Sequence, residues 1–129
     1  MVAKDIMTKE IITVSPTTSV KKLAMTLVKN QISGAPVLDK NGKIIGVVSE
    51  ADIVGKKGKD VKAIMSKKVI SATEDTPVDA VAKLMTTHKI TRLPVMRDDK
   101  VIGIVSRADI VNAIAMGKHI ALRTGDSEA

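Results

Sequence analysis

The sequence predicts an α+β fold made of two copies of one β-α-β-β-α unit, and an internal repeat is the main observation behind that prediction. Residues 6–54 align with residues 64–111 through a single one-residue gap near Gly42. The agreement is closest at the end of each copy, where GVVSEADIV matches GIVSRADIV. A repeat of this kind indicates one structural unit made twice, and a unit of this size buries too little apolar surface to be stable alone. We therefore expect the two copies to share one core.

The first copy begins with a β-prone run and continues into a helix. Ile11, Ile12 and Val14 favour a short strand. Pro16 and Thr17 then introduce a segment in which apolar residues recur at helical spacing, which predicts an amphipathic helix of about three turns. The apolar residues of this helix are Val20, Leu23, Ala24, Leu27 and Val28.

Two strands and a second helix complete the first copy. Residues 35–38 and 43–48 are apolar runs that flank DKNG, and Asn-Gly between such runs is the strongest short hairpin signal. The two strands are therefore expected to pair antiparallel. Ser49 opens a helix that continues to about Val54, before GKKGKD at residues 55–60 breaks the pattern as a linker.

The second copy repeats these elements. Thr76 and Pro77 mark a helix start, because proline at the first helical position loses only an amide that has no helical partner. Residues 93–96 and 100–105 are its two strands. The apolar stripe of its first helix consists of Val78, Val81, Ala82 and Met85.

The last helix is expected to be longer than its counterpart in the first copy. After Ser106 the apolar pattern continues through Ile114 and Ala115 to Leu122. The apolar surface left over on this helix predicts association as a homodimer. The predicted boundaries are 6–54 for the first domain, 55–60 for the linker, 61–117 for the second domain, and 118–129 for a helix end and flexible tail.

The composition limits the function classes. Apolar residues make up 44% of the 129 residues, yet Phe, Trp and Tyr are absent, so any flat ligand must be held by aliphatic walls. The absence of cysteine excludes a disulfide framework and a thiol nucleophile, and it is typical of a reducing compartment. No run is apolar enough to span a membrane, and the charged N-terminus has no apolar signal region. We expect a cytoplasmic protein with no membrane partner.

The formal net charge of +7 leaves two interpretations open. A basic chain often binds nucleic acid, but the lysines are scattered, no aromatic residue is present to stack on a base, and no nucleic-acid-binding signature occurs. A solvated lysine-rich surface is therefore favoured over a nucleic-acid surface. A small anionic ligand is a better match to the charge.

These elements resemble a known family. The β-α-β-β-α unit, the APV and LPV strands, and the junction with Gly, two apolar residues, Ser and Asp look like tandem CBS (cystathionine-β-synthase) domains, which form a Bateman module. The resemblance covers most of the chain, with no other domain attached. It implies two units related by pseudo-twofold symmetry and two clefts that bind AMP, ADP, ATP or S-adenosylmethionine as ligand, with no obligatory cofactor. It also implies regulation of an unidentified protein partner, not catalysis.

Serine and aspartate recur at both strand-to-helix junctions. Ser49 precedes Asp52, and Ser106 precedes Asp109, at the same spacing. From the residues alone, this spacing indicates a capping box, although the third position of such a box usually holds Glu or Gln. The resemblance implies that each aspartate accepts the ribose hydroxyls and that each serine, with the helix N-terminus, faces phosphate. It adds Ser33, Gly34 and Ala108 to the residues lining the clefts.

Arg92 distinguishes the two copies, because the aligned residue in the first copy is Gly34. The resemblance implies that a basic residue at this place, next to Thr91, holds a phosphate, for which the fork of a guanidinium is well suited. A surface arginine without a role is the alternative. If Arg92 binds phosphate, the two clefts differ in affinity.

The adenine wall is expected to be aliphatic, by correspondence with the family. Each of these residues has plain core packing as an equal alternative. Facing Asp109 we expect Met7, Ile12, Ile32 and Ile104. Facing Asp52 we expect Met65, Ile70, Ile90 and Val47.

Three hypotheses for the function remain, and none is catalytic. His88 and His119 have no partner at metal-ligand spacing, and no activated nucleophile is recognisable. The first hypothesis is an adenosine-ligand sensor, the second is a structural module that dimerises or docks with empty clefts, and the third is a basic nucleic-acid-associated protein.

Overall fold

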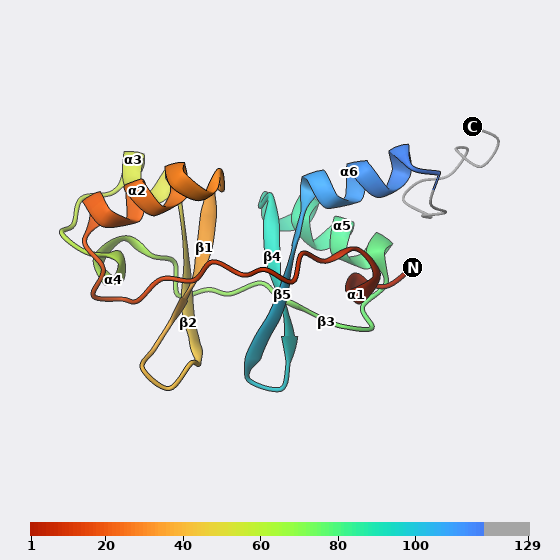
Figure 1. Cartoon of the computed structure of the whole chain (residues 1–129), viewed down its shortest axis with the longest axis horizontal. Helices are drawn as coiled ribbons and strands as arrows, with labels where there is room; N and C mark the ends of the chain where they lie inside the picture. The colour runs from red at the N-terminus through yellow and green to blue at the C-terminus, as the bar shows by residue number, and fades with distance from the viewer. Residues whose placement is uncertain (118–129) are drawn as a thin grey trace. The chain divides into compact units, whose positions relative to one another are not determined.

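The computed structural model describes residues 1–117, and the chain divides into two compact units (Figure 1). Unit 2 is residues 12–69, and unit 1 is residues 1–11 together with the chain from Ile70 onward. The units therefore differ from the sequence repeats at their leading segments: residues 1–11 belong with the second copy, and residues 61–69 belong with the first. Each unit mixes helices and strands, which confirms the predicted α+β class.

Unit 2 is built around the predicted hairpin. Its strands pair antiparallel, and Oδ1 of Asp39 holds the turn by accepting the amides of Asn41 at 2.9 Å and Lys43 at 3.0 Å. Gly42 has a φ of 81°, in the left-handed region that glycine enters most readily. The elements of unit 2 are α2 (Val20–Asn30), β1 (Gly34–Leu38), β2 (Ile44–Ser49), α3 (Glu50–Gly55) and α4 (Val61–Ile64).

Helix α2 begins at Val20, the first apolar residue of the predicted helix, and Pro16 and Thr17 lie before it. The Pro16 carbonyl accepts the amide of Lys62 at 2.9 Å, at the start of α4. Ser19 caps α2, with its Oγ accepting the Lys22 amide at 3.1 Å. Helix α4, which is a single turn, was not predicted from the sequence.

The apolar stripe of α2 is narrower than predicted. Leu23 and Leu27 are buried, but Val28 is 79% exposed, so its assignment to the stripe was wrong. Each helical residue is turned about 100° from the one before it, which places Val28 to one side of the buried Leu23 and Leu27 face.

Unit 1 contains a three-stranded sheet in the order β3-β4-β5. β3 pairs parallel with β4, and β4 pairs antiparallel with β5, so the second predicted hairpin is also confirmed. The elements of unit 1 are α1 (Ala3–Ile6), β3 (Ala72–Thr73), α5 (Val78–His88), β4 (Arg92–Arg97), β5 (Lys100–Ser106) and α6 (Arg107–Ala115).

The strand predicted at the start of the first copy was wrong for Ile11 and Ile12. Only Val14 takes part in a ladder, as an isolated parallel bridge to Val37. The amide of Val14 donates to the Pro36 carbonyl at 3.0 Å. Ile11 ends the leading segment of unit 1 and Ile12 begins unit 2, so the chain is passing from one unit to the other at this point.

The helices of unit 1 agree with the prediction except at their ends. Pro77 is the N-cap of α5 and Val78 is its first helical residue, so the proline lies one position earlier than expected. Helix α6 ends at Ala115 and is followed by a turn at Met116 and Gly117, so the predicted continuation was wrong for these two residues, and its remainder to Leu122 lies outside the described residues. No helix within residues 1–117 is long and apolar enough to cross a membrane.

The buried apolar residues form two clusters, so the expectation of one shared core was wrong. The cluster of unit 1 includes Leu93, Val95 and Val105, and it takes Ala3 from α1. The cluster of unit 2 takes Val61 and Ile64 from α4 in the same way. Each core is therefore completed by the leading segment of the other copy.

Candidate functional site

The two junctions with serine and aspartate form capping boxes in the structure. The Ser49 amide donates to Oδ2 of Asp52 at 2.9 Å, and the Ser106 amide donates to Oδ2 of Asp109 at 2.8 Å. The Ser106 hydroxyl also accepts the Asp109 amide at 3.1 Å. The capping interpretation therefore holds for both aspartates, and it uses one carboxylate oxygen of each.

The other carboxylate oxygen, Oδ1, has different surroundings in the two units. In unit 2, Nζ of Lys56 lies 2.8 Å from Oδ1 of Asp52. In unit 1, Oδ1 of Asp109 accepts only a long hydrogen bond, 3.5 Å, from the Thr8 hydroxyl among the contacts within residues 1–117. Two carboxylates at equivalent positions of the repeat are thus engaged unequally.

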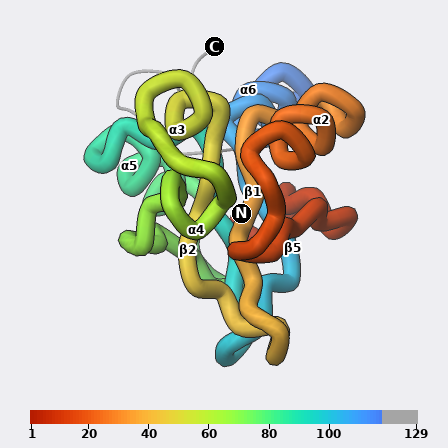
Figure 2. Tube along the Cα trace, turned by 90° about the vertical axis from the view of Figure 1, so that its left-hand side faces the viewer, coloured from red at the N-terminus to blue at the C-terminus, as the bar shows by residue number. Residues whose placement is uncertain are grey.

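The leading segments run beside the strands that precede these aspartates. In unit 1, Thr8 and Ile104 exchange two backbone hydrogen bonds, at 2.8 and 3.0 Å. In unit 2, Ser66 and Val47 do the same at 2.8 and 2.9 Å, and Figure 2 shows α4 alongside β2. Because Thr8 also reaches Asp109, the structure brings the first leading segment to that carboxylate.

A methionine directly precedes Thr8 and another directly precedes Ser66, and each packs over a glycine. Met7 lies against Gly103 in β5, and Met65 lies against Gly46 in β2. Met7 and Ile104 thus belong to unit 1 together with Asp109, and Met65 and Val47 belong to unit 2 together with Asp52.

The remaining residues proposed for the adenine wall belong to the opposite units from their expected aspartates. Ile32 packs against the core of unit 2, whereas Ile70 and Ile90 pack against the core of unit 1. Ile12 is half-buried at the start of unit 2. Ile32, Ile70 and Ile90 therefore pack against the cores of their own units, as the alternative of plain core packing predicts.

Arg92 opens β4 directly across from Ser106, as Gly34 is across from Ser49. Its guanidinium is half-buried and donates through Nη2 to the Thr91 hydroxyl at 2.8 Å. This register places a cation beside the residue that caps α6.

The backbone carbonyl that precedes Arg92 and the one that precedes Gly34 each accept a hydrogen bond from the start of the following helix. The Thr91 carbonyl accepts the Arg107 amide at 2.8 Å, and the Ser33 carbonyl accepts the Glu50 amide at 2.9 Å. Each bond fixes the first amide of the following helix. Ala108, the second residue of α6, is exposed.

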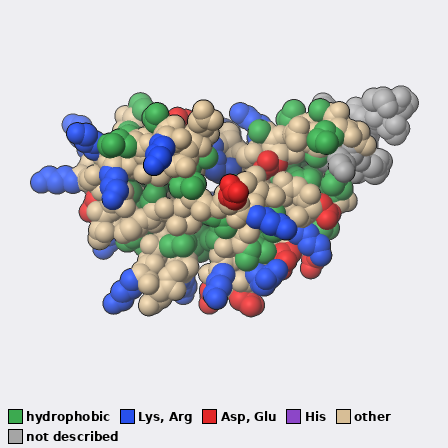
Figure 3. Space-filling model, in the orientation of Figure 1, with side chains coloured by type: hydrophobic (Ala, Val, Ile, Leu, Met, Phe, Trp, Pro, Cys, Tyr) green, Lys and Arg blue, Asp and Glu red, His purple; other side chains and the backbone are tan. Residues whose placement is uncertain are grey.

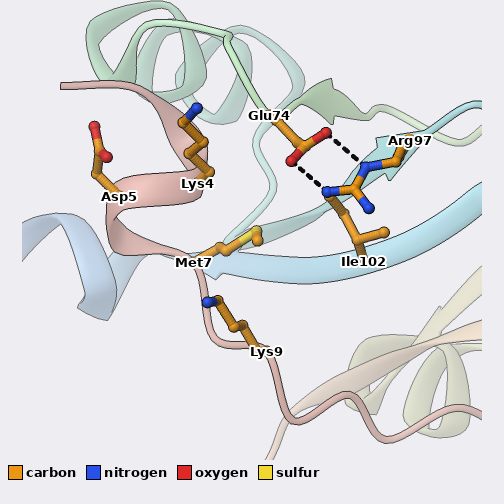
Figure 4. Close-up of a pocket in the computed structure, with 7 residues that line it drawn as sticks. All are labelled: Lys4, Asp5, Met7, Lys9, Glu74, Arg97 and Ile102. Carbon is orange, nitrogen blue, oxygen red and sulfur yellow. Dashed lines mark hydrogen bonds and ion pairs between the residues drawn. The ribbon is translucent and has the colours of Figure 1, made fainter.

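A separate pocket of about 510 Å³ in unit 1 was not predicted from the sequence (Figure 4). Arg97 and Glu74 form a two-point ion pair at its edge, with N to O distances of 2.8 and 2.7 Å. The hydrogen bonds from Arg97 lower the pKa of Glu74 below its ordinary value of 4.5, and the same pair raises the pKa of Arg97. The lining residues are Lys4, Asp5, Met7, Lys9, Glu74, Arg97 and Ile102.

The lining of this pocket does not match the predicted aliphatic adenine wall, because five of its seven residues are charged. Only Met7 is shared with the predicted site. Within residues 1–117 no group of three His, Cys, Asp or Glu side chains is arranged to hold a metal ion.

Lys56, Thr8 and Ser66 were not predicted as site residues from the sequence. Lys56 follows Asp52 by four residues, a spacing at which opposite charges meet on a helix, so this contact was recognisable. Thr8 and Ser66 occupy equivalent positions in the aligned copies and both carry a hydroxyl. That shared feature was the available signal for them.

The comparison with curated proteins finds relatives that are much longer than this chain. L-aspartate semialdehyde sulfurtransferase from Methanocaldococcus jannaschii is 38% identical over 111 residues, which are 83% of this chain and 22% of the relative. Inosine-5′-monophosphate dehydrogenase from the same organism is 34% identical over 112 residues, which are 84% of this chain and 23% of the relative. The chain thus spans less than a quarter of the length of these two proteins.

Two solved structures resemble the fold over nearly their whole length. The CBS domain pair of protein MJ0100, in complex with 5′-methylthioadenosine and S-adenosyl-L-methionine, is 35% identical with a TM-score of 0.86, covering 92% of this chain and 98% of that one. CBSX2 from Arabidopsis thaliana, in complex with AMP, is 31% identical with a TM-score of 0.84 and the same coverage. The family model for the CBS domain matches twice, at residues 3–58 and 61–116. Because these matches cover both copies of the repeat, the chain belongs to the CBS domain family and is a tandem pair of CBS domains.

Proposed function

We propose that this CBS domain pair binds an adenosine ligand, namely AMP, ADP, ATP or S-adenosylmethionine, and regulates a protein partner in response. The observation that supports the proposal most directly is the hydrogen bonding of the Asp109 carboxylate. Its Oδ2 is fixed by the Ser106 amide, while its Oδ1 receives only the long bond from Thr8 among the described residues. A carboxylate held in this way is a rigid acceptor for the paired hydroxyls of a ribose.

The surroundings of Asp109 support a nucleoside ligand. Met7 and Ile104 supply the polarizable and aliphatic surface that a purine requires where no aromatic residue exists. Arg92, across from Ser106, supplies a cation for a phosphate. The similar structures contain AMP or S-adenosyl-L-methionine with 5′-methylthioadenosine, which are all adenosine compounds.

The ligand proposal has a direct test, because the chain has no Trp or Tyr and absorbs little in the near ultraviolet. An adenine compound that copurifies would dominate the absorption spectrum. Titration with AMP, ATP and S-adenosylmethionine is expected to raise the melting temperature, since a ligand that binds only the folded state stabilises it. Asp109→Asn keeps an oxygen for the Ser106 amide and is expected to remove binding at that site while the protein remains folded.

No copurifying adenine compound, together with no heat signal and no thermal shift from any of these ligands, would contradict the proposal. Loss of stability in Asp109→Asn with binding intact would show that the aspartate serves only as a cap.

We propose in addition that the chain forms a homodimer through α6. Val111 and Met116 are 60% and 69% exposed, and Figure 3 shows apolar side chains at the surface in the region of this helix. Exposed apolar residues gathered on a helix and directly after its end are typical of an interface. Lysine and arginine side chains, by contrast, are interspersed with other residues on the visible face, so no nucleic-acid surface is favoured (Figure 3).

Sedimentation is expected to show a dimer at micromolar concentrations. Ile114→Lys is expected to shift the equilibrium to monomer, because it places a charge among the apolar residues of α6. Asn112→Lys adds the same charge to an exposed position of the same helix and serves as the control. A wild-type monomer at high micromolar concentration would exclude the proposed dimer.

A further inference from the structure

Lys56 forms a contact that has no counterpart among the described residues of the other copy. Its Nζ lies 2.8 Å from Oδ1 of Asp52 and donates to the Ile64 carbonyl at 3.1 Å. Because Oδ2 of Asp52 accepts the Ser49 amide, both carboxylate oxygens are engaged within the chain. We infer that Lys56 acts as an internal competitor at Asp52 and makes that site bind adenosine ligands more weakly than the Asp109 site.

The burial of the pair makes the competition effective. The Asp52 side chain is only 15% exposed, so water replaces the lysine poorly as a partner for the carboxylate. The Lys56 side chain is 48% exposed and is anchored at a second point on the last residue of α4. Since α4 leads directly to Met65, the lysine links α3 to the segment that packs on β2.

The equivalent position in unit 1 excludes such a competitor. The residue four positions after Asp109 is Ala113, which is buried and 6% exposed. A lysine side chain would have to leave the apolar surroundings of Ala113 to reach the carboxylate. The asymmetry between the sites is therefore built into the sequences of the two helices.

This inference depends on the proposed function, since it assumes that a ribose binds at these aspartates. A ligand at Asp52 must displace the Lys56 ammonium group from Oδ1. Because Lys56 belongs to the same chain and lies at the end of the same helix, its effective concentration at Asp52 does not fall when the protein is diluted. An uncharged nucleoside has no anionic group that could pair with the displaced ammonium group. A phosphorylated ligand offers it a new counter-ion, so the penalty is expected to be smaller for AMP than for an uncharged compound.

The test uses a protein in which only the Asp52 site remains, and 5′-methylthioadenosine as the uncharged probe. In the Asp109→Asn background, Lys56→Gln is expected to increase the affinity for the probe about fivefold by calorimetry. The gain for AMP is expected to be smaller. Lys57→Gln removes the same charge from the neighbouring exposed lysine and is expected to leave the affinity unchanged. Lys56→Arg, which keeps a cation there, is expected to remain weak.

Unchanged or weaker probe binding in Lys56→Gln, in a protein whose melting curve shows it to be folded, would overturn the competition and make the lysine a clamp between α3 and α4. An equal gain in Lys57→Gln would also overturn it, because net charge alone would then explain the effect. The proposed function is judged separately by the wild-type protein: if the probe binds at Asp109 but Lys56→Gln brings no gain at Asp52, only the competition fails. If wild-type protein binds no adenosine compound, both fail.

Discussion

Replacing Gly46 by alanine is expected to lower the free energy of unfolding by about 1–3 kcal/mol, the usual cost of inserting a group where no space exists. A Cβ at this position would lie 2.7 Å from the Ser66 carbonyl oxygen and 2.7 Å from Sδ of Met65. The carbonyl belongs to the backbone pair between Ser66 and Val47, so it is unable to move without weakening those bonds. Thermal or urea unfolding of Gly46→Ala measures the loss.

Gly103→Ala is the matched control, because it adds the same methyl group at the equivalent place in β5. Its nearest neighbours are side-chain atoms of Met7, which is able to change rotamer, so a smaller loss is expected. Shortening Met7 to alanine in the Gly103→Ala protein is expected to recover part of that loss, whereas Met65→Ala is expected to recover little in Gly46→Ala. Equal losses at the two glycines would show that the Ser66 carbonyl does not set the requirement for glycine at position 46.

These contacts explain why glycine recurs at both junctions. The recurrence is visible in the sequence, but its physical reason is not. The alignment of GVVSEADIV with GIVSRADIV indicated a site, because polar residues keep their spacing in an apolar frame. The structure assigns the glycines to the close approach of Met7 and Met65, and it assigns the serine and aspartate pairs to helix capping. Part of the repeated motif therefore has a purely structural cause.

The elements that could be predicted are those whose signal is local. The Asn-Gly turn predicted the β1 and β2 hairpin, since that dipeptide favours positive φ where the chain reverses. Leu23 and Leu27 predicted the buried face of α2 by their spacing. In each case residues close in sequence determine the backbone conformation. The second copy of the repeat then shows the same pattern again and supports the same prediction.

The features that escaped prediction depend on contacts between segments that are distant in sequence. Helices α1 and α4 are four residues each, too short for any periodicity to be recognised. The exchange of leading segments between the copies brings Thr8 to Ile104 and Ser66 to Val47. An alignment of the copies contains no information on which copy each segment joins, and only the family resemblance grouped Met7 with Ile104 and Met65 with Val47. The buried residues also form two clusters where one core was expected, and each cluster includes residues of an exchanged segment.

Arg92→Ala is expected to weaken AMP binding tenfold or more and to leave the binding of 5′-methylthioadenosine nearly unchanged. A charge-assisted hydrogen bond from a guanidinium to phosphate contributes about 1.5–3 kcal/mol, and about 1.4 kcal/mol corresponds to a factor of ten in affinity. The prediction follows from the register of the sheet, in which Arg92 lies across from Ser106, the residue that caps α6. Calorimetry with both ligands on the same protein separates a phosphate role from a general effect on the fold.

Arg97→Ala is the appropriate control, because it removes the same charge from the other end of β4, where the guanidinium is paired with Glu74. If net positive charge alone attracted AMP, the two substitutions would weaken its binding equally, and the loss would shrink in both as salt is added. A direct contact from Arg92 instead predicts that its effect exceeds that of Arg97 at every salt concentration. Equal losses of AMP and 5′-methylthioadenosine in Arg92→Ala would show that the arginine supports β4 and does not bind phosphate, since only the charged ligand carries the group it is proposed to hold.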